Sequence, residues 1–221
     1  MSTSRDRVRQ ALSHQGSDRI PVDFGATAVT GIHCRVVEAL RKHYGLSYKP
    51  VKIVDTFQML GEVDRDLADA MGVDCIGVGG TRDIFDHDTE CMHEQVTPWG
   101  QKVLVPIQLD LTQDKEGDVY VYAGGDKNYP PSAVMPNGCF FINAIERQQP
   151  INEDKLNPMD NLEEFNSITD EELDAYKKKV NEASATGRAV VASFGGTALG
   201  DVAFVPGMGL KEPKGIRSVV E

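Results

Sequence analysis

The chain has 221 residues, 34 of them acidic and 23 basic, so its formal net charge is −11. This acidic balance argues against a sequence-independent nucleic-acid binder and against docking on an anionic membrane, because both need an excess of Lys and Arg. A hydrophobic fraction of 40% with 26% charged residues excludes a wholly disordered chain. No apolar run approaches the roughly 20 residues that span a bilayer, no secretory leader is recognisable, and the four cysteines include no C-x-x-C pair. We therefore expect a cytoplasmic protein without disulfides.

The first quarter of the chain predicts a helix, a strand and a second helix. Thr3 and Asp6 form the pattern of a capping box, ahead of apolar residues at helical spacing. Residues 20–24 are a short apolar run closed by a glycine, and we expect them to form the first strand. Thr30 is the expected cap of the second helix, which ends at Gly45.

A third helix and a second strand are expected next. Asp55 is the expected cap of a helix whose apolar residues run from Phe57 to Met71, and Gly72 is its expected end. Residues 73–78 have the composition of a buried strand.

The middle of the chain, residues 97–147, has no helical spacing and predicts a β-hairpin insertion. Asp114 to Gly117 is a turn signal between two of its segments. The β-prone runs are residues 103–105, 109–111, 119–122 and 139–142.

Helix and strand return after residue 168. Thr169 and Glu172 form a second capping box, and residues 189–194 read as a third buried strand. Buried strands alternating with helices predict parallel pairing and an α/β architecture. An apolar stripe begins at Ile216 and stops at Glu221, which suggests a fragment; a frayed native C-terminus is the alternative.

Polar residues at the ends of the expected strands are the candidate site, because parallel α/β folds bind ligands there. Asp23 either points into this mouth or is tied to backbone N–H groups of a loop. His33, in the first turn of the second helix, either contacts a substrate carboxylate or caps the helix. Gly195, Gly196 and Thr197 let backbone N–H groups approach a ligand, or simply form a tight turn.

The loop after the second strand concentrates groups that could bind a metal ion. Their spacing matches no metal-binding loop that we can place, so we expect a solvated acidic loop and no metal. The residues are Asp83, Asp86, His87, Asp88, Glu90 and His93.

Several segments resemble the uroporphyrinogen decarboxylase superfamily, which includes corrinoid-dependent methyltransferases. Residues 4–8 and 18–22 resemble its N-terminus, residues 55–74 its next helix and strand, and residues 190–199 its strand and glycine turn. The resemblance implies that residues 1–221 are the N-terminal part of a (β/α)₈ TIM barrel, with the 97–147 insertion inside it.

One departure separates the branches of this superfamily. True decarboxylases carry an arginine-rich segment after the first strand, whereas this chain has no arginine between Arg19 and Arg35. A porphyrinogen with eight carboxylates needs such cations. The resemblance therefore implies corrinoid-linked methyl transfer rather than haem synthesis, with Asp23 and Asp83 as catalytic candidates and His33 with the 195–197 turn binding substrate.

The methyltransferase branch binds zinc through an H-x-C motif and a later cysteine in its C-terminal half, and this chain has no such motif. We expect no cofactor within the chain, whereas the resemblance implies zinc and a corrinoid protein partner for a full-length enzyme acting on a small molecule. The fragment alone is expected to be inactive and to form a homodimer across its open edge. The alternatives are a uroporphyrinogen III decarboxylase of porphyrin biosynthesis with a diverged acid-binding segment, and a non-catalytic binding domain.

Overall fold

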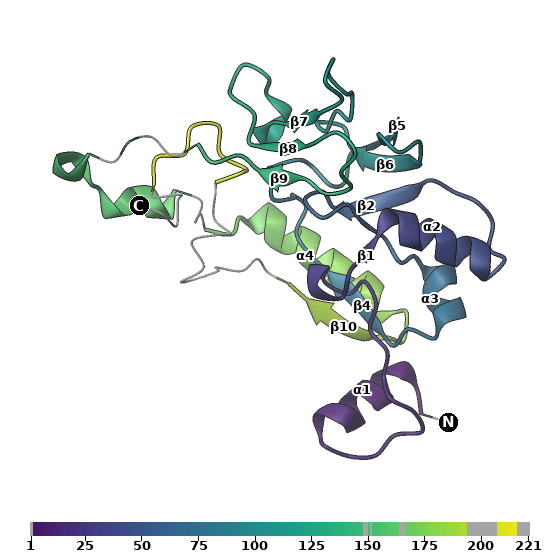
Figure 1. Ribbon diagram of the computed structural model, residues 1–221. Helices are drawn as coiled ribbons and strands as arrows, with labels where there is room; N and C mark the ends of the chain where they lie inside the picture. Colours follow the sequence, from purple (N-terminus) through teal and green to yellow (C-terminus); the bar gives the residue numbers. More distant parts are fainter. Residues whose placement is uncertain (1, 148–149, 151, 164–166, 194–206, 216–221) are drawn as a thin grey trace. The chain divides into compact units, whose positions relative to one another are not determined.

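The chain folds into two compact units in the computed structural model, which describes residues 2–147, 150, 152–163, 167–193 and 207–215 (Figure 1). The first unit comprises residues 1–55, 59–81 and 169–195, and the second comprises residues 56–58, 82–168 and 196–221. Together they form a mixed α/β structure, and the described residues contain no closed barrel. None of the described helices is both long and apolar enough to span a membrane.

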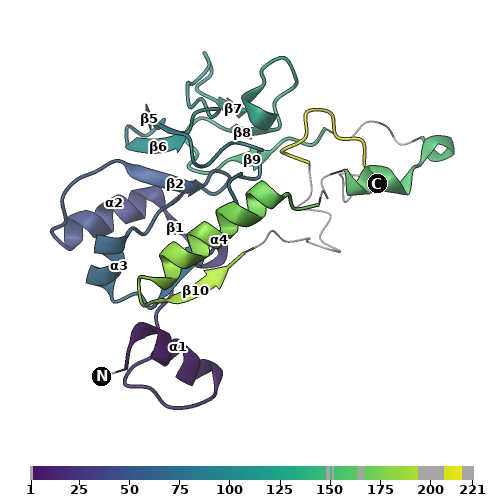
Figure 2. The same ribbon diagram turned by 180° about the vertical axis from the view of Figure 1, so that it is seen from behind.

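A parallel strand pair lies at the centre of the first unit. Strand β4 (Cys75–Val78) pairs in parallel with β10 (Ala189–Ala192), with Ala189 opposite Cys75. Helix α4 (Asp170–Ser184) runs alongside both strands (Figures 1 and 2). The parallel pairing expected for the second and third strands is confirmed.

The expectation that residues 20–24 form a strand is wrong, although the segment runs beside β4. The carbonyl of Val22 accepts a hydrogen bond from the Asp74 amide (2.8 Å), and Ala26 packs against Gly77, so the two segments run in the same direction. The Val22 amide donates to the Asp74 carboxylate (2.9 Å) instead of to a strand, and Pro21 has no N–H to donate. The backbone pairing that defines a strand is therefore interrupted.

Two of the four predicted helix starts are confirmed and two are displaced. Capping boxes begin α1 (Ser4–Leu12) and α4, as the sequence predicts. Helix α2 (Cys34–His43) begins after His33, and the expected cap Thr30 instead ends a short 3₁₀ turn, η1 (Ala28–Thr30).

The first half of the predicted third helix is wrong. Strand β3 (Leu60–Gly61) lies there and pairs antiparallel with both β1 (Ile32–His33) and β2 (Val51–Asp55). Helix α3 (Arg65–Met71) starts only after its cap Asp64 and ends at Gly72 in the left-handed conformation, as expected. Pairing with the adjacent strand β2 and with the earlier strand β1 overrides the helical spacing of residues 57–63.

The second unit is built from antiparallel strands. Strands β5 (Met92–Val96) and β6 (Lys102–Pro106) form a hairpin, and β8 (Ala133–Met135) pairs with β7 (Val119–Val121) on one side and β9 (Asn143–Ala144) on the other. Short 3₁₀ turns complete it: η2 (Ala123–Gly125), η3 (Glu153–Lys155) and η4 (Pro158–Leu162).

Two of the four β-prone runs of this unit do not form strands. Residues 103–105 and 119–121 lie in strands as expected, whereas 109–111 and 139–142 do not. The Leu111 amide donates to the side-chain oxygen of Gln95 (2.7 Å), so a side chain takes the place of a neighbouring strand.

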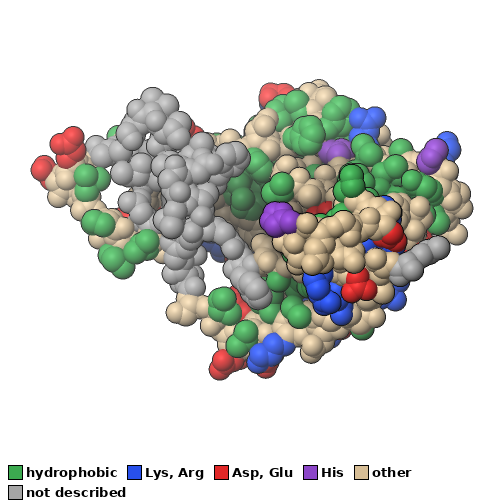
Figure 3. Space-filling model, turned by 90° about the horizontal axis from the view of Figure 1, so that it is seen from below, with side chains coloured by type: hydrophobic (Ala, Val, Ile, Leu, Met, Phe, Trp, Pro, Cys, Tyr) green, Lys and Arg blue, Asp and Glu red, His purple; other side chains and the backbone are tan. Residues whose placement is uncertain are grey.

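Each unit has its own buried apolar residues. Val37, Ile53, Met59 and Leu67 are buried in the first unit, and Phe85, Val103, Leu109, Val119 and Met135 in the second. Hydrophobic side chains also appear at the surface, beside acidic and basic groups (Figure 3).

Candidate functional site

The carboxyl ends of β4 and β10 form the edge of the first unit where a parallel α/β fold binds its ligand. Beyond β4 the chain continues into Gly79 and Gly80, and beyond β10 into Ser193. Both ends are held by α4. Lys179 Nζ donates to the Gly80 carbonyl (3.0 Å), and the Tyr176 hydroxyl donates to the Ser193 carbonyl (3.2 Å).

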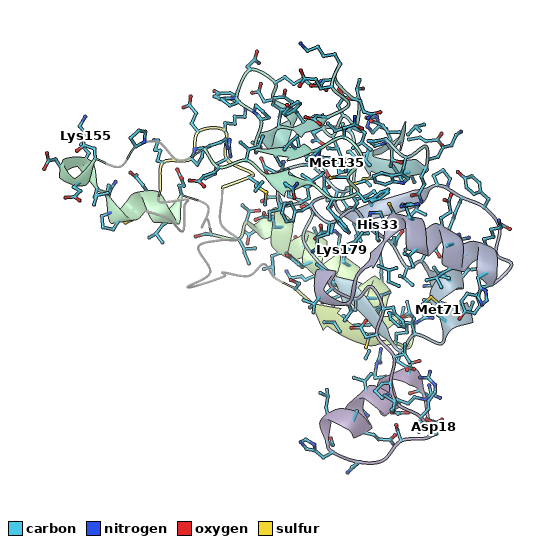
Figure 4. All side chains as sticks on the ribbon, viewed as in Figure 1. Asp18, His33, Met71, Met135, Lys155 and Lys179 are labelled. Carbon is cyan, nitrogen blue, oxygen red and sulfur yellow. The ribbon has the colours of Figure 1, made fainter. Side chains whose placement is uncertain are left out.

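Tyr176 and Lys179 were missed as candidates for this edge. The helical pattern assigns Tyr176 to the buried face of α4, and Lys179 is one of three consecutive lysines. The signal was the i, i+3 spacing, which puts both long side chains on one helical face. Figure 4 labels Lys179 on α4. The candidates Gly195, Gly196 and Thr197 lie outside the described residues.

Asp23 lies half-buried in the turn that follows Val22. Its Oδ1 accepts a hydrogen bond from the amide of Ala26 (3.3 Å), which is one of the two roles considered for it. Burial raises the pKa of the neighbouring Cys75 thiol, and the Asp23 and Asp74 carboxylates raise it further. This environment keeps the thiol protonated and makes Cys75 a poor nucleophile.

His33 caps α2. Its Nδ1 accepts a hydrogen bond from the Arg35 amide (3.3 Å), which satisfies one of the helix's first N–H groups. Figure 4 shows His33 at the start of α2. The ring is half-buried, and its Nδ1 is engaged in the cap.

Asp83 lies in the second unit and is almost completely buried, with a side chain only 5% exposed. Its Oδ1 accepts from the amides of Phe85 and His87, both at 2.9 Å. Its Oδ2 accepts from the Thr56 hydroxyl (2.6 Å) and lies 3.2 Å from His87 Nδ1. A carboxylate with this many partners is part of the loop's internal framework.

The pKa of the Asp83 carboxyl follows from these partners. Burial alone would raise that pKa, but the His87 contact and the Thr56 hydroxyl lower it by more, so the net direction is downward. The carboxylate is therefore ionised at neutral pH. The two catalytic candidates belong to different units, Asp23 to the first and Asp83 to the second.

The other candidate metal ligands between residues 83 and 93 have local partners, and His93 lies in strand β5 rather than in the loop. Arg82 forms an ion pair with Asp86 (3.2 Å), the Asp88 carboxylate accepts from the Glu90 amide (2.8 Å), and His93 Nε2 lies 3.3 Å from the Leu109 carbonyl. Among the described residues, no group of three or more His, Cys, Asp and Glu side chains is placed to hold a metal ion.

No family model, curated protein or solved structure matches the chain. Its chemistry is therefore inferred from the two groups of residues above. At the α4-held edge of β4 and β10, Lys179 and Tyr176 hold the carbonyls of Gly80 and Ser193. The Asp83 carboxylate is closed to a ligand, because it is buried and both of its oxygens already accept hydrogen bonds.

Proposed function

We propose that the chain is the N-terminal part of a (β/α)₈ enzyme of the uroporphyrinogen decarboxylase type that transfers a methyl group in partnership with a corrinoid protein. The parallel β4–β10 pair, with residues 22–26 running beside β4 in the same direction, carries the proposal. Three neighbouring parallel segments with a helix on the sheet are what the start of such a barrel requires.

On this proposal, the substrate binds at the carboxyl ends of β4 and β10. Lys179 and Tyr176 reach this end from α4 and fix the carbonyls of Gly80 and Ser193. Holding the Gly80 carbonyl sets the direction of the chain that leaves β4 and hence of the backbone N–H groups that a small anionic substrate would meet there. We assign Lys179 and Tyr176 positioning roles.

The ion pairs of the first unit favour methyl transfer over porphyrinogen decarboxylation. A substrate with eight carboxylates needs several available guanidinium groups. Four arginines of this unit are instead paired with its own aspartates: Arg7 with Asp18 and Asp74, Arg19 with Asp74, Arg41 with Asp64 and Asp66, and Arg188 with Asp69.

The described residues do not fit a zinc centre of the kind that activates a thiol in methyl transfer, because no group of three or more His, Cys, Asp and Glu side chains among them is placed to hold a metal ion. No step is therefore assigned to zinc on the described residues.

The test uses protein expressed from the whole reading frame that encodes the chain. The protein is mixed with methylcobalamin and a small thiol, and the corrinoid absorbance is followed. In the expected reaction the cobalt–carbon bond breaks with its electron pair left on cobalt, a sulfur–carbon bond forms, and the thiol proton is released. A parallel assay supplies uroporphyrinogen III and measures decarboxylated porphyrins.

Matched variants link the activity to the proposed edge. Lys179→Met and Tyr176→Phe should lower kcat/KM about tenfold, which corresponds to about 1.4 kcal/mol of transition-state stabilisation. Lys178→Met, on the exposed face of α4, should have no effect. Decarboxylation without methyl transfer would establish the decarboxylase alternative. Absence of both activities would overturn the proposal and favour the non-catalytic binding domain.

A further inference from the structure

Asn137 lies in an exposed turn directly after β8, and it is the one asparagine of the sequence that precedes a glycine. The turn spans residues 136–139 and is closed by the Cys139 amide, which donates to the Pro136 carbonyl (2.9 Å). Gly138 has a φ of +78° there, a conformation that favours glycine. Figure 4 labels Met135, the last residue of β8, two residues before Asn137.

The side chain of Asn137 connects this turn to the turn at residues 114–118. Its Nδ2 donates to the Glu116 carbonyl (3.0 Å), and the backbone amide of Asn137 donates to Asp118 Oδ1 (2.8 Å). The side chain lies against Gly117, where an added Cβ would overlap Nδ2. The contact with Glu116 needs an N–H on the side chain, which an amide has and a carboxylate lacks.

The residue that follows makes this amide reactive. When the Gly138 nitrogen loses its proton, it can attack Cγ of Asn137. A carbon–nitrogen bond forms, the bond between Cγ and Nδ2 breaks, and Nδ2 takes up a proton and leaves as ammonia. Water then opens the succinimide ring at either carbonyl, which gives aspartate or isoaspartate. Gly138 hinders the attack little, because it has no side chain and a Cβ built there would meet no described atom within 4 Å.

We propose that Asn137 is a site of spontaneous deamidation, and that its conversion to aspartate or isoaspartate disconnects the 136–139 turn from the 114–118 turn. The product has a carboxylate oxygen in place of Nδ2, so the Glu116 carbonyl loses its donor. The new negative charge also lies near that of Asp118, which accepts from the backbone amide of the same residue. Because ammonia is lost, the change runs in one direction.

The reaction is tested on the full, unmodified chain. The protein is incubated at mildly alkaline pH in water labelled with the heavy oxygen isotope, and its tryptic peptides are examined by mass spectrometry. Ring opening places the heavy oxygen in the product, so conversion during the incubation is distinguished from conversion during digestion. Residues 128–147 form one tryptic peptide, which also contains the exposed Asn128 and Asn143 as internal references. We expect Asn137 to be converted at least about ten times faster than either, and comparable rates for the three would overturn the proposal.

Two variants test the structural consequence. Asn137→Asp reproduces one product, and the Gly117 amide, which donates to the Asp114 carbonyl (3.1 Å), should then exchange its hydrogen about tenfold faster in NMR measurements. Asn143→Asp makes the same substitution at an exposed residue of β9 and should leave this exchange rate unchanged. An unchanged rate in Asn137→Asp, or an equal rise in both variants, would show that residue 137 does not hold the 114–118 turn and would overturn the proposed disconnection.

Discussion

Arg19 holds the buried carboxylate of Asp74 through both of its terminal guanidinium nitrogens, Nη1 at 2.6 Å from Oδ2 and Nη2 at 3.0 Å from Oδ1. Arg7 of α1 adds a third contact at 3.1 Å, and the Val22 amide donates at 2.9 Å. Burial raises the pKa of the Asp74 carboxyl, but these partners lower it by more. Asp74, the residue directly before β4, thus connects that strand to α1 and to the 20–24 segment.

Asp74→Asn should therefore destabilise the first unit. The amide leaves Arg19 without its counter-charge and removes one of the two carboxylates paired with Arg7, and removing one partner of a buried ion pair typically costs about 3–5 kcal/mol. We expect a loss of roughly 3 kcal/mol in the free energy of unfolding, at the lower end because Arg19 is partly exposed. Urea denaturation followed by circular dichroism measures it. Asp18→Asn, which also removes a contact with Arg7 but at a more exposed carboxylate, should have a much smaller effect; equal losses would contradict the role of Asp74.

Because of Asp83, we expect the free energy of unfolding of the second unit to fall at acid pH. Because the pKa of the Asp83 carboxyl in the folded chain lies below its ordinary value of 3.8, the unfolded chain binds this proton more readily. The stabilisation is therefore complete above about pH 5 and is lost as the pH falls through the folded pKa. In Asp83→Asn the free energy of unfolding should be lower at neutral pH and should decline less steeply between about pH 5 and about pH 2. Parallel slopes for the two proteins, measured by urea denaturation across that range, would rule this out.

Local signals predicted the fold where the chain determines its structure over three or four residues. The capping boxes at Thr3 and Thr169 and the left-handed helix end at Gly72 need only near neighbours, and all three are present. The spacing of residues 57–63 was misleading because Leu60 and Gly61 pair with the adjacent strand β2 in a hairpin and with β1 earlier in the chain. The helical spacing concealed the hairpin, and no local pattern shows the pairing with β1.

The candidate site residues show the same difference between what local and long-range interactions determine. His33 was expected in the first turn of a helix capped by Thr30, whereas it is itself the cap of α2, so its place near the helix start was predicted only to within a few residues. The burial of Asp83 could not be predicted, because it depends on Thr56, 27 residues earlier, and through His87 on Tyr122, 35 residues later than that histidine. Acidic residues in a loop suggested solvent exposure, and Asp83 departs from this expectation.

Two variants of His33 distinguish its two considered roles, which are capping α2 and contacting a substrate. If it acts as the cap of α2, His33→Ala should lower the free energy of unfolding by about 1 kcal/mol, and His33→Asn should restore it, because Asn is a good N-cap. If it contacts substrate, both variants should lose substrate affinity although His33→Asn keeps the stability. Thermal unfolding together with the methyl-transfer assay distinguishes these outcomes. A full loss of stability in His33→Asn would contradict the capping role.

Gly77 tests whether residues 22–26 truly lie against β4. A Cβ at this position would overlap the backbone carbonyl of Ala26, and a backbone group cannot move aside as a flexible side chain can. Gly77→Ala should therefore destabilise the first unit by about 3 kcal/mol, at the upper end of the usual cost of overpacking. Gly79→Ala is the matched control, because a Cβ there meets nothing within 4 Å. Urea denaturation of both variants compares their free energies of unfolding. If Gly77→Ala were as stable as Gly79→Ala, residues 22–26 would not lie against β4. The barrel proposal would then lose its third parallel segment.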